Sequence, residues 1–253
     1  TYQVREISDS SFQGSNLKSV FIPSNIIKIG EVVFCSCPQL ESINVDKGNK
    51  VYDSRNNCNA IIETATNDLI RGCKNTIIPN GIVSIHKHAF CGSKELNNIH
   101  LPNSINTIEE KAFQMCKSLT SIIIPNGVRS IEDMTFSSCS SLTSVTIPSS
   151  VTNIGKEAFH ACRALPSITI PDGVTNIDSK AFFLCQSLVS ITIPNSVTNI
   201  GYRAFYGCTS LKSITISNSL TSIGETVFAG CKDLTSISIP SSVSSISTNA
   251  FSG

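Results

Sequence analysis

A 23-residue phrase recurs ten times along this 253-residue chain, and its period constrains the fold more than any other feature. The copy that begins at Leu188 reads LVSITIPNSVTNIGYRAFYGC, and two polar residues separate it from the next copy at Leu211. Seven copies follow one another without interruption from Leu96 to the end of the chain. A fixed period of this length predicts a solenoid, in which each repeat forms one turn and packs only on its neighbours.

Each position of the phrase has a physical interpretation. Positions are counted from the leucine that begins each copy. Ile168 and Ile170 occupy positions four and six around a polar residue, and this alternation predicts a short strand with one buried face. Pro171 follows at position seven and ends the strand, because proline has no amide hydrogen to donate. Val174 and Ile177, at positions ten and thirteen, are predicted to form a second inward pair.

Two further positions complete the buried set of each turn. Position one is a leucine, and positions seventeen and eighteen read Ala-Phe in most copies. About seven apolar side chains per turn, at about 1.5 to 3 kcal/mol each, offset the entropy of ordering the chain. The phenylalanines are predicted to stack as a spine: Phe12, Phe34, Phe90, Phe113, Phe136, Phe159, Phe182, Phe205, Phe228 and Phe251.

The expected fold is an α/β leucine-rich-repeat solenoid, a curved right-handed stack of about ten turns. A parallel β-sheet lines its concave face, and the remainder is mostly β and irregular structure with short helical turns. A single domain is predicted over 1–253, with a partial repeat at 1–16, repeats at 17–39 and 40–95, and seven regular repeats at 96–253. Both ends fall inside a copy, so we expect a fragment of a longer protein.

The repeat at 40–95 departs from the period. Leu40 and Leu96 are 56 residues apart, which is two periods plus ten. Two short apolar runs, 60–62 and 69–70, flank a polar segment and predict a hairpin-like insert near 46–73. Two interpretations are open: the insert extends one turn structurally, or it contributes to a binding face, as insertions in solenoids often do.

Eleven cysteines raise the question of disulfides or metal binding. Cysteine occurs at position twenty-one in most copies, so the thiols are predicted to form a buried ladder of small apolar side chains. The spacing lacks the converging Cys-x-x-Cys pairs of zinc sites, and no metal site is predicted. Cys58, in the insert, is the thiol expected to be most exposed. The ladder positions are Cys37, Cys116, Cys139, Cys162, Cys185, Cys208 and Cys231.

Composition and motifs exclude several functions. The net charge is +1 and 15% of residues are charged, without the basic stripe that nucleic-acid binding requires. No apolar run approaches 18 residues, so no transmembrane segment is predicted. The four histidines lack partners at catalytic or ligand spacing, and no nucleophile-elbow, phosphate-loop or zinc-protease motif occurs. We therefore predict no enzyme, no catalytic residue and no cofactor.

The consensus L-x-S-I-x-I-P-x-x-V-x-x-I-G-x-x-A-F-x-x-C resembles the BspA-like leucine-rich repeat, a class found in bacterial surface antigens and in parasitic protists. The resemblance covers nearly the whole chain. It implies a secreted or cell-surface adhesin that binds host matrix or plasma proteins through its concave β-face. The alternative is an intracellular scaffold that binds a cytoplasmic protein, which the many thiols favour. The resemblance leaves the oligomeric state open.

Outward-facing strand residues are the candidate protein-binding site. From Thr146 onward, positions three and five are uniformly serine and threonine. Nearer the N-terminus, position five instead carries larger or apolar groups, and these are the predicted contacts: Phe21, Asn44, Ile77, His100 and Ile123. A remote alternative is ice binding by the stacked Ser-x-Thr columns, which resemble flat threonine arrays, although curvature of the face opposes it.

Overall fold

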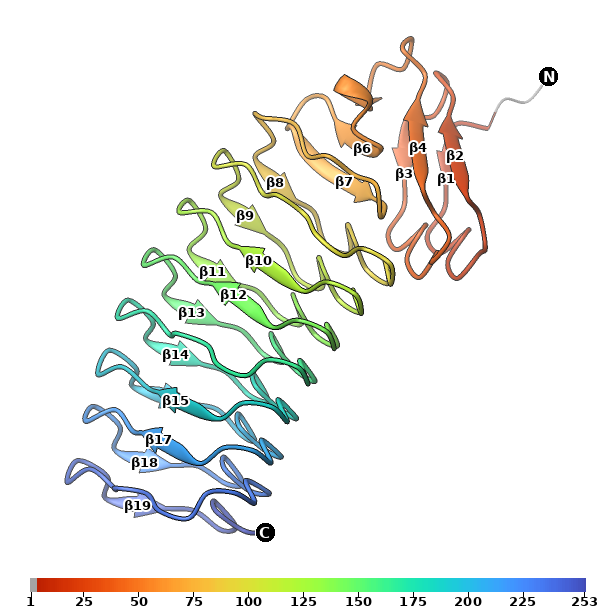
Figure 1. Ribbon diagram of the computed structural model, residues 1–253. Coiled ribbons are helices and arrows are strands. Elements are labelled where there is room, and N and C mark those ends of the chain that lie inside the picture. Colours follow the sequence, from red (N-terminus) through yellow and green to blue (C-terminus); the bar gives the residue numbers. More distant parts are fainter. Residues whose placement is uncertain (1–3) are drawn as a thin grey trace.

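The computed structural model describes residues 4–253, so the first three residues of the expected partial repeat lie outside the described residues. The chain winds into a stack of turns, with the two ends of the chain at opposite ends of the stack (Figure 1). Equivalent residues pair in parallel one period apart, as Ile191 does with Ile214. The predicted leucine-rich-repeat solenoid is confirmed.

Each turn contributes up to two kinds of short strand. Those at positions three to six form the surface here called the strand face: β2 Ser19–Ile22, β4 Ser42–Val45, β10 Ser121–Ile123, β12 Ser144–Thr146, β15 Ser190–Thr192 and β17 Ser213–Thr215. Those at positions twelve and thirteen are β1 Glu6–Ile7, β3 Lys28–Ile29, β8 Ser84–Ile85, β9 Thr107–Ile108, β11 Ser130–Ile131, β13 Asn153–Ile154, β14 Asn176–Ile177, β16 Asn199–Ile200, β18 Ser222–Ile223 and β19 Ser245–Ile246.

The insert supplies β5 Tyr52–Asp53, β6 Ala60–Glu63, β7 Asp68–Gly72 and the 3-10 helix η1 Arg55–Asn57. Within residues 4–253, η1 is the one helical segment, so the expected short helical turns are almost absent. The corners of the turns are built instead from residues with positive φ, such as Arg203 at 55°.

The strand alternation produces the predicted burial. Ile191 and Ile193 are 4% and 1% exposed, whereas Ser190 and Thr192 on either side of Ile191 face solvent. The ring of Phe205 lies between those of Phe182 and Phe228 in the spine. From Phe90 to Phe251, successive ring centroids are 5.1–5.6 Å apart and the rings are nearly parallel.

The cysteine ladder is buried, as predicted, and it also has a hydrogen-bonding role. The Cys162 thiol donates to the carbonyl oxygen of Phe136 in the preceding turn at 3.2 Å, and the same bond recurs at 3.1–3.3 Å along the ladder. Each Phe carbonyl has two lone pairs, and it accepts the thiol in addition to a backbone amide of its own turn, as Phe136 accepts the Cys139 amide at 3.1 Å. Burial raises the pKa of the Cys185 thiol to about 12, which keeps it protonated.

The insert forms the predicted hairpin, with β6 and β7 antiparallel. Strand β7 then pairs in parallel with β8, which aligns Leu69 with Ile85 at position thirteen. The chain reaches Cys73, the residue in the next leucine slot, only four residues after Leu69. This turn therefore has no Ala-Phe corner, and the Phe spine is interrupted here.

A disulfide joins the two corners on either side of the missing one. Cys35 and Cys91 follow the spine residues Phe34 and Phe90, and their Cα atoms are 5.1 Å apart. This bond could not be predicted from the sequence, because the two cysteines are 56 residues apart. The expectation that Cys58 is the most exposed thiol is wrong, because Cys58 is 1% exposed. Its segment folds back against Ala60 in the core.

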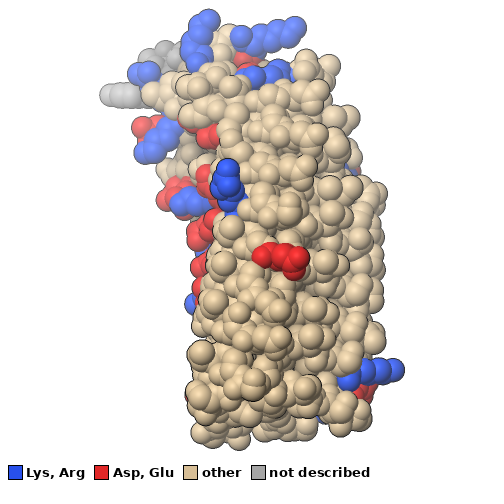
Figure 2. All heavy atoms as spheres, turned by 90° about the vertical axis from the view of Figure 1, so that its left-hand side faces the viewer, with Lys and Arg blue, Asp and Glu red and all other residues tan. Residues whose placement is uncertain are grey.

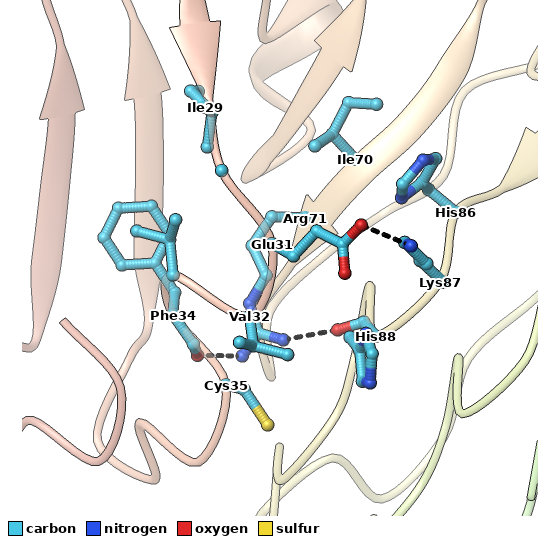
Figure 3. A pocket seen from close by; sticks show the side chains of 12 residues that line it. Ile29, Glu31, Val32, Phe34, Cys35, Ile70, Arg71, His86, Lys87 and His88 are labelled. Atoms are coloured by element: carbon cyan, nitrogen blue, oxygen red, sulfur yellow. Dashed lines mark hydrogen bonds and ion pairs between the residues drawn. The ribbon is translucent and has the colours of Figure 1, made fainter. Parts of the chain in front are cut away.

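Arg71 on β7 occupies the interior behind the disulfide and is 5% exposed (Figure 3). Its guanidinium group donates to the carbonyl oxygens of Phe34, His88 (2.9 Å) and Cys91 (3.3 Å). In the regular turns, a thiol at position twenty-one of the next turn donates to the Phe carbonyl. After the insert, Ser93 occupies position twenty-one, so the Phe34 carbonyl receives no ladder thiol. Burial lowers the pKa of Arg71 to about 10, which still leaves it charged at neutral pH.

Candidate functional site

All five predicted contact residues face solvent on the strand side of the stack. Phe21, Ile77 and Ile123 are 62%, 74% and 69% exposed, and Asn44 and His100 are exposed as well. The residues that flank Ile123 are each 2% exposed. The outward orientation follows from strand alternation, because the neighbouring isoleucines fill the core.

The structure separates these five residues into two groups. Ile77, His100 and Ile123 occupy position five of three consecutive turns and are here called the Ile77 stripe. The turns are held in register by backbone bonds such as that from the Thr120 amide to the Asn97 carbonyl, 3.2 Å. One turn, which carries His100 at position five, separates Ile77 from Ile123. The stripe is a compact, largely apolar patch.

Charged residues beside the stripe fix the edge of these turns. The Lys74 ammonium group contacts Glu41 at 2.9 Å and Glu95 at 2.7 Å, so it joins three turns. The hydrogen bond to Glu95, and then that to Glu41, raises the pKa of Lys74. An apolar patch bordered by charged and polar groups is the arrangement typical of protein interfaces.

Phe21 and Asn44 belong to a second feature, here called the N-terminal hollow. The two residues are direct register partners on β2 and β4, and together with the insert they line a depression of about 970 Å³. The opposite wall is the segment from Tyr52 to Asn57, which includes η1. The insert therefore turns part of a flat strand face into a walled site.

The walls of the hollow are held by hydrogen bonds. Asp53 receives three bonds from the Arg55 guanidinium group, at 2.9, 3.0 and 2.6 Å, and Arg55 also donates to Asn67 at 2.8 Å. The Val45 amide donates to the Ser54 hydroxyl oxygen at 2.9 Å. These insert residues were missed as site residues, although an Asn- and Asp-rich segment directly after a strand was a usable signal.

The rest of the strand face is different in character. Toward the C-terminus, its exposed positions are hydroxyl groups such as Ser190, Thr192, Ser213 and Thr215. Figure 2 shows one side of the stack, on which charged side chains gather toward the N-terminal end and the remainder is largely uncharged. The chemically varied surface is therefore the N-terminal half, which contains both the stripe and the hollow.

A second cavity lies at the junction behind the disulfide (Figure 3). It has a volume of about 60 Å³ and is lined by Ile70, Arg71 and the Glu31–Lys87 ion pair, among others. This volume accommodates little more than water, so the cavity is a packing gap left by the missing corner. Residues 4–253 contain no cluster of His, Cys, Asp and Glu suited to a metal ion. In the same range, no helix has the length and apolar character to cross a membrane.

Comparisons with known proteins agree with this architecture. A family model described as the BspA type leucine rich repeat region matches residues 1–68, 69–186 and 152–253, with six copies. No curated protein matches the chain.

The solved structures similar to the chain include the following three. A leucine-rich repeat protein from Bacteroides ovatus is 26% identical, with a TM-score of 0.61 and coverage of 100% of this chain and 80% of that one. One from Eubacterium ventriosum is 22% identical, with a TM-score of 0.67 and coverage of 99% and 68%. A leucine rich cell surface protein from Faecalibacterium prausnitzii is 28% identical, with a TM-score of 0.48 and coverage of 100% and 75%.

Proposed function

Because the chain belongs to the BspA-type leucine-rich repeat family, we propose that it is a non-catalytic module that binds a protein through the Ile77 stripe. The observation that carries the proposal is the exposure of Ile77 and Ile123, 74% and 69%, on a strand face that is otherwise rich in hydroxyl groups. Burial of a large apolar side chain against a partner is favourable by about 25 cal/mol of free energy per Å² of apolar surface removed from water. A rigid solenoid presents such groups without an ordering cost on binding.

We further propose that the module belongs to a secreted or cell-surface adhesin whose partner is a host matrix or plasma protein. The Cys35–Cys91 disulfide supports this location, because such bonds persist in oxidising compartments. Nine cysteines among residues 4–253 carry free thiols, which is the argument for a cytoplasmic scaffold. All nine are buried, and burial protects thiols from oxidation in either compartment.

Interferometry against immobilised fibronectin, fibrinogen and a host-cell surface extract tests the proposed function. The test variant is Ile77→Asp with Ile123→Asp, which places two charges on the stripe and leaves the core untouched. The matched control is Thr192→Asp with Thr215→Asp, two exposed position-five residues on the C-terminal turns.

We expect saturable binding that the stripe variant loses and the control retains. Binding that survives in the stripe variant would refute the site. No binding by the native chain to any of these surfaces would refute the adhesin and favour the cytoplasmic scaffold.

A further inference from the structure

We propose that the N-terminal hollow is a saccharide-binding subsite, in which Phe21 is the stacking platform for a neutral sugar ring. This inference rests on the proposed adhesin function, since it names a second chemical class that the same surface recognises. The hollow shares no residue with the Ile77 stripe.

The environment of Phe21 suits a stacked sugar ring. Its side chain is 62% exposed, and the adjacent position-five residue across the strand pair is the polar Asn44. The electron-rich face of an aromatic ring attracts groups that carry partial positive charge. One face of a pyranose ring consists of such C–H groups, whereas its edge consists of hydroxyls. An exposed ring in a depression where most of the lining residues are polar matches that pattern.

Several side chains around the Phe21 ring have unused hydrogen-bonding groups. Asn56 and Asn57 are exposed, and their side chains make no hydrogen bond to another residue of 4–253. Asp46 accepts the Gly48 amide through one carboxylate oxygen, at 2.7 Å, and the second oxygen faces no donor among the described residues. An Asn amide presents one acceptor and one donor group in a plane, and an ionised Asp carboxylate presents two acceptors, so the two kinds of side chain together suit vicinal hydroxyls.

The acidic and basic side chains that line the hollow balance each other in charge. The hollow is lined by two acidic residues, Asp46 and Asp53, and by two basic residues, Lys47 and Arg55. Asp53 and Arg55 already neutralise each other through their paired bonds. The balance provides no net attraction for a phosphate, a sulfate or a strongly charged peptide. A neutral polar ligand is the class that this balance favours.

A peptide fits the hollow less well. Peptides commonly bind beside strands by pairing with free backbone groups at a sheet edge. Here the Val45 amide of β4 already donates to the Ser54 hydroxyl oxygen at 2.9 Å, so this amide is not free to pair with a peptide. The volume of about 970 Å³ is near the upper end of ligand pockets and has room for an oligosaccharide of a few rings.

The test is saturation-transfer NMR with the native chain and a panel of neutral mono- and oligosaccharides that contain glucose, galactose, mannose or N-acetylglucosamine. Titration of any ligand found then compares Phe21→Ala with Ile123→Ala. Both side chains are exposed to a similar degree, 62% and 69%, so neither substitution disturbs the core. We expect Phe21→Ala to weaken binding about tenfold and Ile123→Ala to change it less than about twofold.

Three results would overturn the proposal: no saccharide binds, binding is independent of Phe21, or an array of extended peptides binds in a Phe21-dependent manner instead. The Ile77→Asp with Ile123→Asp variant separates this proposal from the proposed function. It should retain saccharide binding while it loses the protein partner. Loss of the saccharide signal alone, in Phe21→Ala, with protein binding intact would confirm two independent subsites.

Discussion

The stacked spine makes a quantitative prediction about position in the solenoid. Phe159 is fully buried, and its ring centroid lies 5.5 Å from that of Phe136 and 5.3 Å from that of Phe182. Core Phe-to-Ala substitutions cost about 3–5 kcal/mol of unfolding free energy. Phe159→Ala removes two stacking contacts, and the hydrogen-bonded turns on both sides resist collapse into the cavity. We therefore expect a loss at the upper end, about 4–5 kcal/mol.

Phe251→Ala is the matched control. Its ring is partly exposed and stacks on one neighbour, Phe228, at 5.3 Å. The loss should be about 1–2 kcal/mol, because less area leaves the core and one contact disappears. Urea unfolding followed by circular dichroism measures both values. Hydrogen exchange shows which turns are destabilised, since each turn of a solenoid is coupled only to its neighbours. Equal losses, or a loss below about 2 kcal/mol for Phe159→Ala, would refute the account of the spine.

Three other outcomes follow from the core. The Cys185 thiol ionises above about pH 9 in the unfolded chain and only near pH 12 in the folded chain. Its contribution to the free energy of unfolding is therefore intact below pH 9 and falls as pH rises. The difference in unfolding free energy between native chain and Cys185→Ala should therefore shrink by about 1.4 kcal/mol from pH 8 to pH 10 in urea titrations; an unchanged difference contradicts a buried thiol. Mass spectrometry after iodoacetamide should find no labelled thiol in the folded chain and nine after denaturation, with the Cys35–Cys91 pair adding two only after reduction. Ile168→Asp should unfold its turn, because a buried unpaired charge is costly, and a native circular dichroism melt would contradict that.

The regular turns could be predicted from the sequence because each one repeats the same local chemistry. In the turn of Ile191, strand alternation, the proline stop and the Phe corner all specify one conformation, and its neighbours repeat it. The buried thiols at position twenty-one followed from the same periodicity. Their bonds to the preceding Phe carbonyl did not, because a period gives position along the stack and no hydrogen-bonding partner.

The junction could not be predicted, because it depends on what the insert leaves out. Cys35 and Cys91 meet only because β7 leads directly into Cys73 and omits a Phe corner. Counting residues gives two periods plus ten and does not reveal which part of a turn is missing. Arg71, in a polar-flanked hairpin, likewise gave no sign that it would be buried beside the carbonyl of Phe34.

The candidate site was predicted in part. Strand alternation was sufficient to orient Phe21 and Ile123 outward, as the structure has them. It could not separate Phe21 and Asn44 from the other three residues, because the wall of the hollow folds back from the insert. Asn56 and Asn57 were therefore absent from the predicted site. A loop's path over a strand face depends on tertiary contacts such as that between Val45 and Ser54.

Photo-crosslinking tests the proposed binding site, since it reports contact between the stripe and a partner. A benzophenone amino acid is placed at His100, between Ile77 and Ile123, and separately at Thr192 on the hydroxyl-rich turns. Each chain is irradiated with fibronectin or with fibrinogen. We expect a covalent product from the His100 position and none from the Thr192 position. Crosslinking from Thr192 alone, or from both positions equally, would contradict the proposed site.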